Sequence, residues 1–175
     1  MKIIVGVSGA SGASLGLKAY DLIPSEHQKF LVISDNARVV LKNEEGYKND
    51  DIAAPIASGS FGADAMLLAP CSMNTLAKIA CGIADNLITR AASVMIKEKR
   101  RFTIAPREAP FDPIALENML KLSQIGVIIA PPILGYYADR ETIDDMERFI
   151  VGKWFDLLGI KNDLYKRWSG GVNLD

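Results

Sequence analysis

Five short apolar runs restrict the possible folds of this chain more than any other feature of its sequence. They cover residues 3–7, 30–33, 65–69, 102–105 and 127–130. Each is rich in β-branched residues or leucine, and none alternates apolar with polar residues, which is the pattern of a strand covered on both faces. Strands of this kind form parallel sheets that lie between two layers of helices.

Segments with helical spacing separate these runs. They cover residues 15–23, 36–42, 86–99 and 114–126, and a last apolar stripe runs from Ile143 to Leu157. The alternation predicts a doubly wound α/β fold of the Rossmann or flavodoxin-like type, with a mostly parallel sheet, helices on both faces and right-handed crossovers. Because no linker or repeat interrupts the pattern, we expect residues 1–175 to form a single domain.

The bulk composition excludes several classes of protein. A net charge of −1 gives no positive field that would gather nucleic acid. No apolar run approaches the ~20 residues that cross a bilayer, and the N-terminus is typical of a strand rather than of a signal peptide. Two cysteines are too few for a disulfide framework, so we expect a cytoplasmic protein. The hydrophobic fraction of 49% favours a fully buried sheet, an oligomer interface or both.

A glycine-rich loop follows the first apolar run. The segment Gly6-Val-Ser-Gly-Ala-Ser-Gly-Ala13 matches neither the dinucleotide fingerprint G-x-G-x-x-G nor the P-loop. It still joins a strand to a helix, so its backbone N–H groups can approach an anion and Ser11 can add a hydroxyl. The alternative interpretation is a tight turn that only packs the strand on the helix.

A second polar loop follows the third run. Ser72, Met73, Asn74 and Thr75 place hydroxyls, an amide and free backbone N–H groups where the next helix starts. Two such loops at one edge of a sheet indicate a mononucleotide that lies across the strand ends, as at a topological switch point. Ser34, after the second run, is a candidate third contact.

Charged residues mark the end of the fourth run. Arg107 can hold a phosphate through two hydrogen bonds, and the neighbouring Glu108 can move a proton. Structural ion pairing is the alternative for both. The cluster Lys97-Glu-Lys-Arg-Arg101 is, by itself, typical of a solvated helix end, and Arg90 is equally ambiguous.

Cys71 is a weak candidate for a nucleophile. A nucleophilic cysteine needs a nearby base, and the only histidine, His27, lies in a polar turn with no visible link to this loop. We therefore interpret Cys71 as a small packed residue. One histidine and two cysteines also argue against a His/Cys metal site.

The motifs together resemble the flavin prenyltransferase family (the UbiX type), which belongs to a wider group of flavin-binding proteins that includes the cysteine decarboxylases. The resemblance covers almost the whole chain. It rests on Gly9-Ala-Ser-Gly-Ala13, Ser58-Gly-Ser60, Pro70-Cys-Ser-Met-Asn-Thr75, Asp85-Asn-Leu-Ile-Thr-Arg-Ala-Ala92, Lys97-Glu98, Pro106-Arg-Glu-Ala-Pro110, Leu116-Glu-Asn-Met119, Tyr136-Tyr137, Gly152-Lys-Trp-Phe-Asp156 and Arg167-Trp168.

The resemblance implies a metal-independent transfer of a dimethylallyl group from dimethylallyl monophosphate to N5 and C6 of reduced FMN. The implied FMN contacts are Gly9, Ala10, Ser11, Ser34, Ser72, Met73, Asn74, Thr75 and Arg107. The implied donor contacts are Lys97, Arg107, Glu108, Tyr137 and Lys153, and the implied catalytic groups are Glu108, Lys97, Glu44 and Ser11. The resemblance also implies a homododecamer built from trimers, with sites at subunit contacts, and a decarboxylase that uses the prenylated FMN.

Two residues depart from the family pattern. Lys153 stands where members often carry arginine. A lysine there keeps the positive charge but cannot make the two parallel hydrogen bonds of a guanidinium. Ile52 stands where some members have a tryptophan near the prenyl group. Three other functions stay open. They are a flavin-dependent decarboxylase of a cysteine-containing substrate, a non-catalytic flavin carrier and an enzyme that directly decarboxylates an aromatic acid. The relatives with the first activity use a histidine, and a carrier has no need for a second phosphate site.

Overall fold

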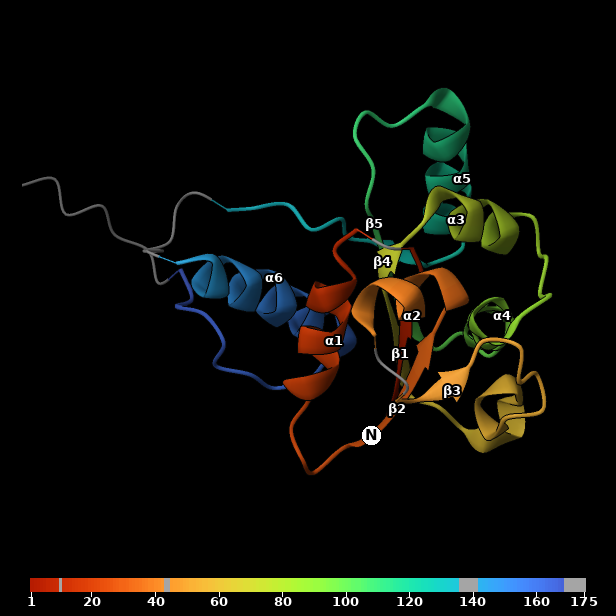
Figure 1. Cartoon of the computed structure of the whole chain (residues 1–175), viewed down its shortest axis with the longest axis horizontal. Helices are drawn as coiled ribbons and strands as arrows, with labels where there is room; N and C mark the ends of the chain where they lie inside the picture. Colours follow the sequence, from red (N-terminus) through yellow and green to blue (C-terminus); the bar gives the residue numbers. More distant parts are fainter. Residues whose placement is uncertain (10, 43–44, 136–141, 169–175) are drawn as a thin grey trace, which may run out of the picture.

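The computed structural model describes residues 1–9, 11–42, 45–135 and 142–168. Its centre is a parallel sheet with the strand order β3-β2-β1-β4-β5-β6 (Figure 1). The strands are β1 (Lys2–Val7), β2 (Gln28–Ile33), β3 (Tyr47–Lys48), β4 (Ala65–Cys71), β5 (Arg101–Pro106) and β6 (Ile128–Ile129). The helices are α1 (Ala13–Asp21), α2 (Asp35–Leu41), α3 (Met73–Ala80), α4 (Leu87–Lys97), α5 (Pro113–Gln124) and α6 (Ile143–Leu158), with 3₁₀ turns η1 (Pro55–Ala57) and η2 (Gly59–Phe61).

The predicted doubly wound α/β fold is confirmed, and the direction of winding reverses next to β1. The chain runs from β1 outward through β2 to β3, and then returns to β4 on the other side of β1. The carboxyl ends of β1 and β4 therefore form the topological switch point, where such sheets bind ligands. The edge strand β3 was not predicted, because its two residues lie in a polar stretch without an apolar run.

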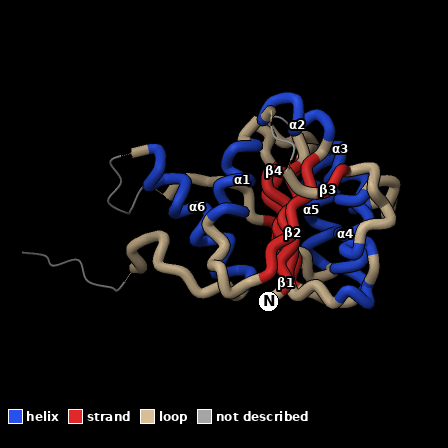
Figure 2. Tube along the Cα trace, turned by 60° about the horizontal axis from the view of Figure 1, so that its bottom comes forward, coloured by secondary structure: helices blue, strands red, loops and turns tan. Residues whose placement is uncertain are grey.

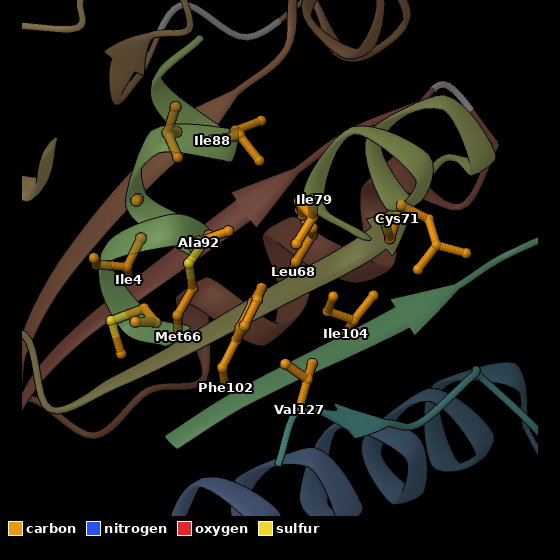
Figure 3. Packing of buried hydrophobic residues seen from close by; sticks show 14 of the residues in the cluster. Ile4, Met66, Leu68, Cys71, Ile79, Ile88, Ala92, Phe102, Ile104 and Val127 are labelled. Carbon is orange, nitrogen blue, oxygen red and sulfur yellow. The ribbon is translucent and has the colours of Figure 1, made fainter. Parts of the chain in front are cut away.

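The two faces of the sheet carry separate hydrophobic clusters. Met66, Leu68 and Phe102 point to the side of α3, α4 and α5, where Figure 3 shows them with Ile104. The alternate residues of β1 and β4 pack on the other face against α1 and α6. Figure 2 shows these helix layers on opposite sides of the strands. Every residue of β4 is buried, which explains its uninterrupted apolar sequence.

The start of α6 projects from the body of the molecule, with residues 131–135 leading out beside it (Figures 1 and 2). Lys18 of α1 holds this end through ion pairs with Asp144 (2.5 Å) and Glu147 (2.6 Å). Further along α6, the Trp154 indole donates a hydrogen bond to the Ala130 carbonyl (2.9 Å). No helix in the described ranges is long and apolar enough to cross a membrane.

Candidate active site

The polar loops predicted from the sequence lie in one row along the carboxyl edge of the sheet, which is the edge where the parallel strands end. Three backbone hydrogen bonds connect them. Ser34 N donates to Val7 O (2.9 Å), Ser8 N donates to Pro70 O (3.0 Å) and Arg107 N donates to Cys71 O (3.2 Å). The loops after β2, β1, β4 and β5 therefore follow one another without a gap, as a ligand that spans the switch point requires.

The loops after β1 and β4 touch each other at the centre of this row. Gly9 has a φ of 94°, and a Cβ atom on it would lie 3.3 Å from Ser72 Cβ. The Ser8 hydroxyl accepts a hydrogen bond from Ser72 N (3.2 Å) and donates one to Pro70 O (3.4 Å). Ser8 is a positioning residue that sequence reasoning missed. The available signal was a serine directly after a buried strand and next to a glycine.

A β-bulge brings the loop after β4 into this position. The pairing of β4 with β5 advances from Leu68–Ile104 to Cys71–Pro106, so three residues of β4 match two of β5. Bulges of this kind occur next to active sites because they redirect the end of a strand.

The amino-terminal end of α1 is open toward the row. Its cap residue is Gly12, in a left-handed conformation and without a side-chain cap. A Cβ atom on Gly12 would lie 3.5 Å from Arg107 Cδ, so the arginine side chain passes beside this helix end. Backbone N–H groups of a first helical turn and a guanidinium both favour an anion. Ser11 is exposed in the same loop.

The serines after β2 and β4 cap the helices that follow them. Ser34 Oγ accepts from Ala37 N (3.4 Å). Ser72 Oγ accepts from Thr75 N (3.3 Å) and donates to Thr75 Oγ1 (3.0 Å). These bonds fix both hydroxyls at the carboxyl edge. Beyond them, Met73 packs against the core and Asn74 is exposed.

The structure separates Cys71 from His27. The Cys71 side chain is buried, and burial raises the pKa of its thiol to about 12. His27 directly precedes β2 and so lies at the amino edge, where the strands begin. A six-residue strand spans about 20 Å, so His27 cannot activate a group at the carboxyl edge of the same chain. This geometry agrees with the interpretation of Cys71 as a packed residue.

Lys97 also lies away from the row of loops. It is the last residue of α4 and precedes β5, whereas Arg107 follows β5. The length of β5 therefore separates the two cations by about 20 Å. Lys97 Nζ is 3.2 Å from Glu98 Oε1 and lies beside Gly59 of η2.

Arg90 stands on the same side of α4 as Lys97, because the two residues are seven positions apart. Its Nε donates to the Ala57 carbonyl of η1 (3.1 Å). Arg90 and Lys97 are both exposed at the side of α4 that faces η1 and η2. Lys97, the last residue of α4, lies at the amino edge, whereas Arg90 lies in the first turn of the same helix, nearer the carboxyl edge.

Of the remaining predicted site residues, the structure describes Glu108 and Lys153. Glu108 is exposed beside Arg107, and its carboxylate accepts a hydrogen bond from Ala109 N (3.1 Å). Lys153 is exposed on α6, where it lines a groove of about 340 Å³ between that helix and residues 130–135. Ala10, Glu44 and Tyr137 lie outside the described residues.

Comparisons with known proteins agree with this arrangement. Residues 1–155 match the model of the flavoprotein family. The flavin prenyltransferase UbiX of Helicobacter pylori is 48% identical, over 97% of this chain and 99% of the relative. The solved structure of AnUbiX (PadA1), a complex with FMN and dimethylallyl pyrophosphate, is 38% identical with a TM-score of 0.90 and covers 98% of both chains.

A second solved structure has the same fold over nearly its full length. It is a dodecameric FMN-dependent UbiX-like decarboxylase from Escherichia coli O157:H7, 41% identical, with a TM-score of 0.88, which covers 97% of this chain and 100% of that one. The row of polar loops and the near-complete coverage at these identities lead to one assignment. This chain belongs to the flavoprotein family and, within it, to the flavin prenyltransferases of the UbiX type.

Proposed function

We propose that this protein transfers a dimethylallyl group from dimethylallyl monophosphate to N5 and C6 of reduced FMN. The observation that carries the proposal is the row of connected loops at the switch point, with Arg107 and Glu108 at its end. The AnUbiX complex, which holds FMN and dimethylallyl pyrophosphate, supports the pairing of FMN with a dimethylallyl donor.

The residues of the row fit FMN. A Cβ atom on Gly9 or Gly12 would fill the space between the loops, and the open end of α1 beside Arg107 favours a phosphate. We assign FMN binding to Gly9, Ala10, Ser11, Ser34, Ser72, Met73, Asn74, Thr75 and Arg107. Bound in reduced form, FMN supplies the nucleophilic atoms N5 and C6.

The protein must stabilise a leaving phosphate and move protons. When the C–O bond of the donor breaks, the phosphate leaves with the bonding electrons, and preorganised cations lower the energy of that charge. We assign this role to Arg107 with Lys97 and Lys153, and we assign Tyr137 to donor binding. Proton transfer is assigned to Glu108, Glu44 and Ser11, since carboxylates and hydroxyls next to the reacting atoms can act as general acids and bases.

The position of Lys97 has a consequence for assembly. Because Lys97 is a strand length from Arg107 in one chain, it can reach a donor phosphate only in the site of a neighbouring copy. Arg90 would accompany it there, and the projecting α6 would carry Lys153 toward another copy. We therefore propose that the sites lie at subunit contacts in a homododecamer. The dodecameric E. coli relative supports this assembly.

The rival functions have less support. A decarboxylase of cysteine-containing substrates would need a histidine, and His27 lies at the amino edge. The solved cysteine decarboxylase SpaF is 24% identical and shows a similarity of fold alone. A flavin carrier would have no use for exposed cations around a second phosphate. We propose a prenylated-FMN-dependent decarboxylase as the recipient of the product.

The deciding experiment is an anaerobic incubation of the protein with reduced FMN and dimethylallyl monophosphate, followed by mass spectrometry of the extracted flavin. A flavin heavier by one C5H8 unit is the expected result. Unmodified FMN, bound by a folded protein, would refute prenyl transfer. Release of carbon dioxide from an aromatic or cysteine-containing acid by the protein alone would favour a decarboxylase.

A further inference from the structure

Residues 160–168 fold back along α6 and are anchored at Asp156. We call this segment the strap. The Asp156 carboxylate accepts hydrogen bonds from the Tyr165 hydroxyl (2.5 Å) and from the Asn162 amide (3.0 Å). It also accepts one from each terminal nitrogen of Arg167 (3.0 and 2.7 Å). A carboxylate held by a guanidinium in two places and by two further donors is a strong and directional anchor.

The strap places the Tyr165 ring on one side of α6. A Cβ atom on Gly152 would come within 2.5 Å of Tyr165 Cδ1, so the ring occupies the space that a side chain at this position would need. The same ring meets Phe149 edge to face, with 5.1 Å between ring centroids and an interplanar angle of 77°. Phe149 is therefore held in place by Tyr165.

Lys153 lies next to this contact. It follows Gly152, and positions 149, 153 and 156 are neighbours on the helix surface because they are three or four residues apart. Lys153 and Phe149 line the same groove beneath residues 130–135. A long side chain on a helix leans toward the helix amino end, which directs the Lys153 stem along Phe149.

We propose that Asp156 and Tyr165 are positioning residues for Lys153. The strap holds Phe149, and Phe149 restricts the directions in which the Lys153 ammonium group can point. This inference rests on the proposed function, in which Lys153 binds the donor phosphate. A lysine loses rotamer freedom when it binds, and a side chain that is already restricted loses less. The strap therefore strengthens donor binding and has no part in FMN binding.

The test is a double-mutant cycle on prenyl transfer with Tyr165→Phe, Lys153→Ala and the pair. Tyr165→Phe keeps the ring and removes its hydrogen bond to Asp156. We expect the KM for dimethylallyl monophosphate to rise roughly three- to ten-fold, as for the loss of one hydrogen bond, with kcat and FMN affinity nearly unchanged. In the Lys153→Ala background the same substitution should change the KM less than about two-fold, because its effect passes through Lys153.

Two further variants complete the test. Gly152→Ala forces the Tyr165 ring away while it raises helix propensity, so it should raise the KM without unfolding α6. Arg148→Gln is the matched control, because it removes an exposed ion pair with Asp144 on the same helix. It should leave the KM unchanged.

The outcomes that would overturn the positioning role differ from the outcome that would refute the proposed function. Two results would overturn the positioning role and leave the proposed function intact. One is an equal effect of Tyr165→Phe on the KM in the presence and in the absence of Lys153. The other is a wild-type KM in both Tyr165→Phe and Gly152→Ala. A wild-type protein that transfers no prenyl group would refute the proposed function itself. A wild-type KM in Lys153→Ala would show that Lys153 does not bind the donor, and the proposed role of the strap would then be wrong as well.

Discussion

Gly16 offers the sharpest test of how the fold builds the proposed FMN site. It lies in α1, where the helix packs on the end of β4. A Cβ atom there would overlap the Ala69 carbonyl oxygen and would lie 2.9 Å from Val7 Cγ2 and 3.1 Å from the Ala69 carbonyl carbon. Two of these three contacts involve backbone, which cannot rotate away. Gly16→Ala must therefore move α1 away from the sheet.

The size of the effect follows from two opposing terms. Alanine improves helix propensity by about 1 kcal/mol. Overpacking costs about 1–3 kcal/mol, and the backbone contact places this site at the upper end of that range. We expect a net destabilisation of about 1–2 kcal/mol, which lowers the Tm by about 2–8 °C in a chain of this length. Relief of the overlap needs a shift of roughly 1 Å, and a displacement of that size can cost ~100-fold in function.

That shift also moves Gly12, at the amino end of α1, relative to Arg107. We therefore expect FMN affinity to fall at least about ten-fold, measured by titration of fluorescence or by calorimetry, together with the lower Tm. Asp21→Ala is the control, because it adds helix propensity at the exposed end of the same helix and should change the free energy of unfolding by less than about 0.5 kcal/mol. Wild-type Tm and FMN affinity in Gly16→Ala would show that α1 does not position the glycine-rich loop for FMN.

Three further predictions concern the site and the strap. Lys97→Ala and Arg107→Ala should each lose most prenyl transfer, and Lys97→Ala should still bind FMN. Refolding the two variants together should restore part of the activity, because the proposal places the two cations of one site in different copies. No recovery would argue for sites within single chains. Cys71 should resist iodoacetamide at pH 9, whereas the exposed Cys81 should react. Burial raises the pKa of the Cys71 thiol to about 12, which leaves only ~0.1% of it as thiolate at this pH. Mass spectrometry of the treated, folded protein should therefore find a single adduct. Burial opposes ionisation of Asp156, but hydrogen bonds from Arg167, Tyr165 and Asn162 lower its pKa below the usual value. The stability advantage over Asp156→Asn should therefore be full above about pH 5 and shrink as the pH falls below about 4 in thermal melts, and a constant difference would contradict the anchor.

In the proposed assembly, the separation of Lys97 from Arg107 would let neighbouring copies use both ends of one sheet. Arg107 and the polar loops stand at the carboxyl edge, and Lys97 stands where β5 begins. A copy that presents its amino edge to the carboxyl edge of a neighbour would complete a phosphate site that neither copy has alone. The exposed apolar residues on the outer helices, such as Val39 and Leu120, are available to hold such contacts.

The sequence by itself determined the layered fold and the edge of the sheet that carries the polar loops. Strands buried on both faces need continuous apolar runs, and the residues that follow them must be polar or glycine to reach a ligand, so both features are visible in one dimension. The short edge strand β3 could not be predicted from the sequence, because it is defined by its backbone pairing with β2 and not by its own side chains.

Only the tertiary structure decided which distant residues meet. The Ser8 contact with Ser72, the approach of Gly16 to Ala69 and the anchor at Asp156 join segments through three-dimensional packing that no local pattern records. The same holds for Lys97, which is ten positions from Arg107 in sequence but about a strand length away in space. Propensity and periodicity act between neighbours along the chain, whereas a site is assembled from the ends of several strands.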